Sequence, residues 1–134
     1  MTHEAKMISG IILLTIPSVQ YGGYFLLRVL SGKFDKANFT DFQKSMFRAG
    51  HAHAGVLLIL SIVCEILIDS IPYDDVWKGV LRSAFPIAVI FISGGFFAAA
   101  GKGITRPTKG IVLLYIGLFL LAISLVILGV GLIM

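Results

Sequence analysis

The stretch Gly110–Met134, GIVLLYIGLFLLAISLVILGVGLIM, contains 25 residues and no charged side chain. At about 1.5 Å per helical residue it is long enough to cross the roughly 30 Å hydrocarbon core of a bilayer. Uncharged runs also cover residues 7–27, 49–64 and 83–101. The chain is 57% hydrophobic and 13% charged, with a mean hydropathy of +0.97. A soluble domain of this size would expose the surplus apolar surface to water, so these runs predict an integral membrane protein.

The four runs predict spans at about residues 7–30, 50–71, 80–101 and 108–134. They lack the short alternating pattern of barrel strands, so helices must satisfy the backbone. The first run is longer than the apolar core of a secretory signal and no cleavage pattern follows it, which favours a retained helix. Short connections predict an all-α, up-down-up-down bundle of four transmembrane helices, with residues 1–134 as a single domain.

Small side chains at Gly22-Gly23 and at Ser93-Gly94-Gly95 predict close helix contacts within this bundle. Cys64 is the only cysteine, so the chain can form no internal disulfide, and we interpret it as an ordinary buried residue.

The first connection contains Thr40-x-x-Gln43, the pattern of a capping box. Phe39, Phe42 and Met46 follow on one helical face. We therefore expect a short interfacial helix that runs into the second span. Its apolar face would contact lipid or, as the alternative, cover the histidines described below.

The apolar spans make the lipid bilayer the first predicted partner. The basic residues that flank these spans are distributed unequally between its two sides. One side carries Arg28, Lys33, Lys36, Lys44, Arg48, Lys102, Arg106 and Lys109, and the other carries Lys6, Lys78 and Arg82. Positive residues concentrate on the cytoplasmic side, so this predicts a multi-pass membrane protein with both termini outside. Because these charges border the spans and form no separate basic face, the net charge of +4 does not indicate nucleic-acid binding.

The second span opens with Gly50-His51-Ala52-His53-Ala54-Gly55. Histidine is the usual neutral nitrogen ligand of haem iron, copper and zinc, and a neighbouring glycine lets a bulky group approach. His51 and His53 are therefore candidate ligands for haem b or for a transition metal, copper or zinc. The two rings lie about 200° apart on an ideal helix, so they cannot readily grip one ion together.

Tyr24, His53 and Tyr115 are expected at similar depths, about 6, 7 and 9 Å from one membrane boundary by helical rise. Either tyrosine hydroxyl could then orient an imidazole that binds a cofactor. The alternative is that both tyrosines belong to the aromatic belt at the interface.

His51, Glu65 and Asp69 fall on one stripe of the second span, which is expected to face inward because polar groups avoid lipid. Gln20 of the first span also needs an internal partner. Together these four residues form a candidate transport path, with the histidine layer and Glu65 as ends of a proton route. Four helices seldom enclose such a path alone, so this hypothesis requires a homo-oligomer.

The leading functional hypothesis is a metal or haem site that serves electron transfer or assists a larger membrane assembly. A bis-histidine haem would need a second subunit, because no other span contains a histidine. The alternatives are the oligomeric transporter and a noncatalytic scaffold. An enzymatic role stays undecided, since no nucleophile is placed beside a base.

The segments 17–27, PSVQYGGYFLL, and 47–63, FRAGHAHAGVLLILSIV, with Thr105-Arg106-Pro107 resemble an uncharacterised family of small four-helix bacterial membrane proteins. This resemblance implies a four-helix fold in a bacterial cell membrane and no particular activity. The second span is also similar to the second helix of haem-copper oxidase catalytic subunits, where a histidine followed by small residues binds haem. The chain lacks the other helices and histidine ligands of those subunits.

Overall fold

A computed structural model describes residues 1–33, 39–101 and 103–134 and contains four helices in that part of the chain. They are α1 (His3–Leu30), α2 (Asp41–Ile68), α3 (Asp75–Ala99) and α4 (Ile111–Ile133). Each is long and apolar enough to cross a membrane, which confirms the all-helical, multi-pass prediction. Lys36 and Lys102, which were counted in the charge comparison, lie outside the described residues.

Local capping explains why three helices begin before the predicted spans. The Thr2 hydroxyl accepts from the Ala5 amide before α1, and the Asp74 carboxylate accepts from the Trp77 amide before α3. At α2 the predicted capping box is present, with Thr40 and Gln43 bonded reciprocally. No proline follows it, so the expected interfacial helix is the first part of one continuous α2 and not a separate element.

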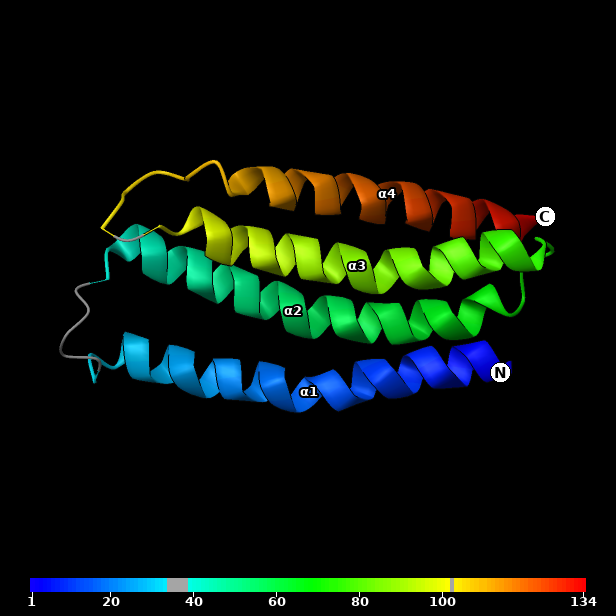
Figure 1. The fold of residues 1–134 in the computed structure, drawn as a ribbon, viewed down its shortest axis with the longest axis horizontal. Helices are drawn as coiled ribbons and strands as arrows, with labels where there is room; N and C mark the ends of the chain where they lie inside the picture. The colour runs from blue at the N-terminus through cyan, green and yellow to red at the C-terminus, as the bar shows by residue number, and fades with distance from the viewer. Residues whose placement is uncertain (34–38, 102) are drawn as a thin grey trace.

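The helices lie side by side in the order α1, α2, α3, α4, each antiparallel to the one before (Figure 1). α3 packs extensively on both α2 and α4, whereas α1 packs mainly on α2 and touches α3 only slightly. Among the described residues α1 and α4 do not touch. The molecule is therefore an open row of four helices rather than a closed ring.

Small residues let α3 and α4 approach closely, as predicted for Gly95. A Cβ atom at Gly95 would overlap the backbone of Leu114, and one at Gly117 would lie 2.8 Å from the amide nitrogen of Ile92. Gly94 differs, because a Cβ there meets nothing within 4 Å. The main apolar core lies further along these helices, around the fully buried side chains of Phe85, Leu81 and Ile68. Cys64 belongs to this core, as predicted.

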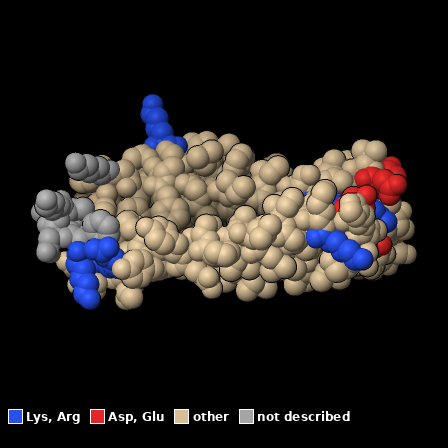
Figure 2. Space-filling view, turned by 60° about the horizontal axis from the view of Figure 1, so that its bottom comes forward, with Lys and Arg blue, Asp and Glu red and all other residues tan. Residues whose placement is uncertain are grey.

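The two ends of the row differ in charge. We call the end where α1 and α3 finish the basic end; its described cations are Arg28, Lys33, Lys44, Arg48, Arg106 and Lys109. The opposite, acidic end contains Asp69, Asp74 and Asp75. On the face shown in Figure 2, charged side chains gather toward the two ends and leave uncharged surface between them. That uncharged surface is the part that lipid would cover.

Candidate functional site

His51 lies in the interface between α1 and α2, near the basic end. A Cβ atom at Gly23 would be 3.1 Å from His51 Nε2, and one at Gly22 would be 3.6 Å from Nδ1. The two glycines therefore give the imidazole room to lie against the α1 backbone. The ring is half-buried, and no hydrogen bond to either ring nitrogen is found within the described residues.

His53 faces away from α1. Its Nδ1 lies 2.7 Å from the carbonyl oxygen of Ala49, one helical turn earlier, and its ring centroid is 4.9 Å from that of Phe96 on α3. A carbonyl oxygen can only accept, so Nδ1 carries the proton and the neutral ring keeps its lone pair on Nε2. The residue is exposed. This is the arrangement in which protein histidines bind metals, with one nitrogen fixed by a backbone carbonyl and the other free.

The structure does not bring the two histidines to a common point, in agreement with their angular separation along the helix. In residues 1–33, 39–101 and 103–134, no three histidine, cysteine, aspartate or glutamate side chains lie close enough to hold a metal ion. A cofactor at His53 would therefore need its further ligands from outside the described chain.

Tyr24 and Tyr115, the tyrosines expected at the depth of the histidines, are both exposed. Tyr24 is 56% exposed and lies beside Tyr21, with ring centroids 6.4 Å apart, and Tyr115 is 62% exposed. No hydrogen bond joins either hydroxyl to an imidazole in the described structure. Equal depth in the membrane does not bring the tyrosines to the histidines, because both tyrosine side chains lie on the outer surface of the protein. This position matches the alternative, an aromatic belt.

Glu65 has a partner that the sequence interpretation missed. Its carboxylate Oε2 accepts a hydrogen bond of 2.9 Å from Arg82 Nη1 of α3, which also donates to the Glu65 carbonyl at 3.1 Å. Both side chains are buried, Glu65 being 0% and Arg82 4% exposed. In the sequence Arg82 was counted only among the basic residues that flank the spans. Its side chain turns back from α3 toward α2 and pairs inside the protein.

Arg82 also connects this pair to the start of the chain. Its Nη2 donates to Asp69 Oδ1 at 2.5 Å and to the Thr2 hydroxyl at 3.2 Å. The Thr2 amide and hydroxyl in turn donate to Asp69 at 2.7 and 2.9 Å. We call Thr2, Glu65, Asp69 and Arg82 the arginine cluster. It ties the beginning of α1 to α2 and α3 and explains why the loosely packed α1 stays attached at the acidic end.

Asp69 follows the last residue of α2, outside the spanning helix. Burial of its carboxyl acts to raise its pKa, but the hydrogen bonds from Thr2 and Arg82 and the positive charge of Arg82 outweigh burial. They hold the pKa of Asp69 well below its usual range. Asp69 is therefore ionised at neutral pH. Glu65 keeps one buried oxygen, Oε1, without a hydrogen-bond partner in the described structure.

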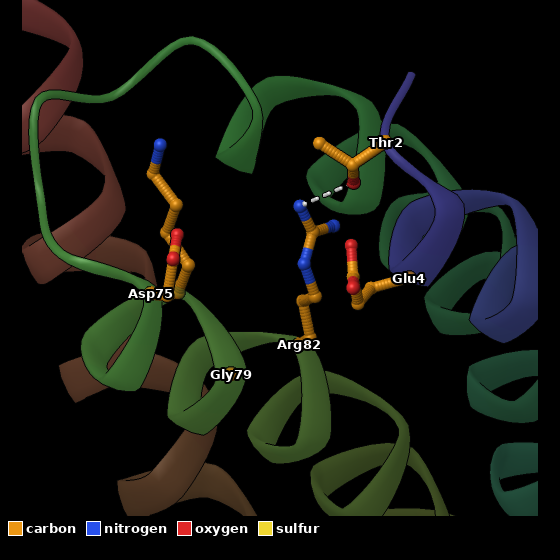
Figure 3. A pocket seen from close by; sticks show the side chains of 6 residues that line it. Thr2, Glu4, Asp75, Gly79 and Arg82 are labelled. Atoms are coloured by element: carbon orange, nitrogen blue, oxygen red, sulfur yellow. Dashed lines mark hydrogen bonds between the residues drawn. The ribbon is translucent and has the colours of Figure 1, made fainter.

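A polar cleft of about 280 Å³ borders the arginine cluster, between the first turns of α1 and α3. Figure 3 shows Arg82 reaching from α3 to Thr2, with Glu4 on one side and Asp75 on the other. The four N–H groups on Nη1 and Nη2 of Arg82 are already engaged by Glu65, Asp69 and Thr2. The guanidinium thus joins helices and has little capacity left for a ligand.

The predicted transport residues are not joined into a path in the described chain. Gln20 is exposed on α1 and makes no hydrogen bond there, so its expected internal partner is not found. His51 and Glu65 are 14 positions apart on α2, or about 21 Å along the helix. Glu65 and Asp69 are both engaged by Arg82.

No protein-family model, no curated protein and no solved structure matches this chain.

Proposed function

We propose that the protein is a small electron-transfer or accessory protein of the membrane that binds haem b or a transition-metal ion, copper or zinc, through His53. The observation that supports this proposal is the bond between His53 Nδ1 and the Ala49 carbonyl, which leaves Nε2 as an exposed ligand atom. His51 points in a different direction around α2 and lies against α1, so His53 would bind the cofactor without His51.

The surroundings of His53 suit a large, flat cofactor. Ala52 and Ala54 flank it in sequence and add little bulk, and the ring packs on Phe96, which limits its rotation. A fixed imidazole loses less conformational entropy on binding than a mobile one. Because His53 is on the surface of the single chain, a second residue to hold the cofactor would come from a second copy or from another membrane subunit. The proposed assembly is thus a homo-oligomer or part of a larger membrane complex.

The proposal includes a location and an orientation. We place the protein in a bacterial cell membrane with the basic end in the cytoplasm and both termini outside. The charge difference between the two ends supports this orientation. The pairing of Arg82 with the carboxylates of Glu65 and Asp69 adds to that difference, because it offsets one of the three basic side chains counted at the acidic end.

An optical spectrum with metal analysis tests the proposed site. Protein purified in mild detergent without chelator, from cells supplied with haem and metals, should contain stoichiometric haem or metal. His53→Leu should remove it, and His51→Leu should retain it. If the wild-type protein contains neither haem nor stoichiometric metal, or if His53→Leu retains the cofactor in full, the proposal is wrong.

A further inference from the structure

A hollow of about 180 Å³ lies on one side of His51, between α1, α2 and the end of α3. Its wall is mostly aromatic. The ring centroids of Phe25 and Phe47 are 6.5 Å apart at 63°, and those of Phe47 and Phe97 are 5.8 Å apart at 28°. Gly22 completes the wall and leaves the space that a side chain would fill. We call this space the aromatic hollow.

His51 and Tyr21 are the lining residues whose side-chain N–H or O–H has no acceptor among the described residues, and of the two only His51 is half-buried between the helices. A neutral imidazole carries one N–H and one lone pair, and neither has a partner in the described residues. The Ser18 hydroxyl also borders the space but already donates to the Thr15 carbonyl at 2.6 Å. A mainly apolar pocket with a small number of polar groups is typical of sites for small, mainly hydrophobic ligands. A ligand carbonyl would give the imidazole N–H its missing acceptor.

A second hollow of about 340 Å³ borders the opposite side of His51. Apart from the imidazole its wall is aliphatic, with Val19 of α1 and Val56 and Ile59 of α2. Tyr21 and Phe97 at the rim of the aromatic hollow are 72% and 43% exposed. In a membrane these exposed rims would face lipid, so a ligand could enter sideways and leave a hydrocarbon tail along the aliphatic surface.

We infer that the aromatic hollow binds the head group of an isoprenoid quinone dissolved in the membrane, with His51 donating to a quinone carbonyl. A flat, electron-poor ring stacks well on aromatic side chains, and the isoprenoid tail matches the aliphatic walls. Pockets for drug-sized ligands hold roughly 300–1,000 Å³. The smaller aromatic hollow therefore suits one ring and not a macrocycle such as haem. The inference concerns His51 and is independent of the cofactor proposed at His53.

Equilibrium binding of a short-chain benzoquinone with one isoprenoid unit, measured on the full chain in nanodiscs, tests this inference. Wild-type protein should bind it saturably and bind the matching alkylbenzene, which lacks carbonyls, more weakly. His51→Leu should weaken quinone binding by about tenfold, the value of one hydrogen bond of roughly 1.4 kcal/mol. His53→Leu should bind as wild type, which separates this test from that of the proposed cofactor.

Filling the hollow gives a second test. A Cβ at Gly22 makes only ordinary contact with His51, so Gly22→Leu should occupy the hollow and abolish saturable binding. Gly10→Leu, on the same helix with open space around it, is the matched control and should bind as wild type. If Gly22→Leu does not fold by circular dichroism and gel filtration, the comparison of His51→Leu with wild type decides. Absence of saturable wild-type binding, or unchanged binding in His51→Leu, overturns the inference.

Discussion

At the scale of single residues, Arg82 has the largest expected effect on stability. One guanidinium bonds to the buried Glu65 carboxylate and to Asp69. Removing one partner of a buried ion pair leaves an uncompensated charge and costs roughly 3–5 kcal/mol. We expect Arg82→Met to lower the free energy of unfolding in detergent micelles by that amount. Circular dichroism during denaturant titration would measure it.

Lys78→Met is the control for Arg82→Met, because it removes the same charge from the same helix at a half-buried position beside the polar cleft. It should change the free energy of unfolding by less than about 0.5 kcal/mol, as is usual for surface substitutions. Equal effects of the two substitutions would show that net charge, and not the arginine cluster, determines stability.

Asp69 should give stability a specific dependence on acid pH. A carboxyl whose pKa is lowered by folding stabilises the protein above its unfolded pKa of about 4. That contribution is lost as the pH falls further toward the folded-state pKa, because protons bind the unfolded chain more readily. Asp69→Asn should therefore be less stable than wild type at pH 7, and the difference should shrink below about pH 4. Unfolding free energies measured between pH 7 and pH 3 would show this.

Asp41→Asn is the control for the acid-pH measurement, since Asp41 is an exposed carboxylate at the opposite end of α2. The free energy of unfolding of Asp41→Asn should stay within about 0.5 kcal/mol of wild type from pH 7 to pH 3, as is usual for surface substitutions. A constant difference between Asp69→Asn and wild type at every pH would contradict the assignment of this effect to the Asp69 carboxyl.

At the scale of helices, the contact between α3 and α4 depends on Gly95. Because a Cβ at this position would overlap the Leu114 backbone, Gly95→Leu should force the two helices apart and destabilise the protein by about 1–3 kcal/mol. Gly94→Leu is the control, because it also replaces a glycine of α3 by leucine but at a position where a Cβ meets nothing within 4 Å. Thermal unfolding of both variants in one detergent distinguishes packing from helix propensity; equal destabilisation would exclude the packing explanation.

The helices themselves could be predicted from local pattern, because each apolar run must bury its backbone polar groups in lipid. The start of α2 could also be predicted from Thr40 and Gln43, because a capping box involves only residues within four positions of each other. The partners of Glu65 could not be predicted. Arg82 is 17 positions away, and whether its side chain turns to water or to α2 depends on how α3 is aligned along α2. The angle around the helix separated His51 from His53 in sequence as in the structure, but depth along the helices does not say toward which side the Tyr24 and Tyr115 side chains point.

At the scale of the whole molecule, the open row of helices leaves α1 with one main neighbour (Figure 1). Half of the most apolar window of α3 is buried, against 6% of that of α1. A membrane protein can tolerate this inequality because lipid covers exposed apolar side chains as well as protein does. The arginine cluster at one end and the His51 contact with Gly22 and Gly23 at the other are the polar features that align α1 on α2.

The orientation proposed for the molecule can be tested at two exposed serines, one at each end of the molecule. Ser31 is exposed at the basic end and Ser70 is exposed at the acidic end, and cysteine closely matches serine in size. The native Cys64 is buried and should react little with a polar reagent. In intact cells a membrane-impermeant maleimide should label Ser70→Cys, and it should label Ser31→Cys only after the membrane is permeabilised. The reverse pattern would mean that the buried pairing of Arg82 and the surplus of cations at the basic end do not determine how this chain inserts.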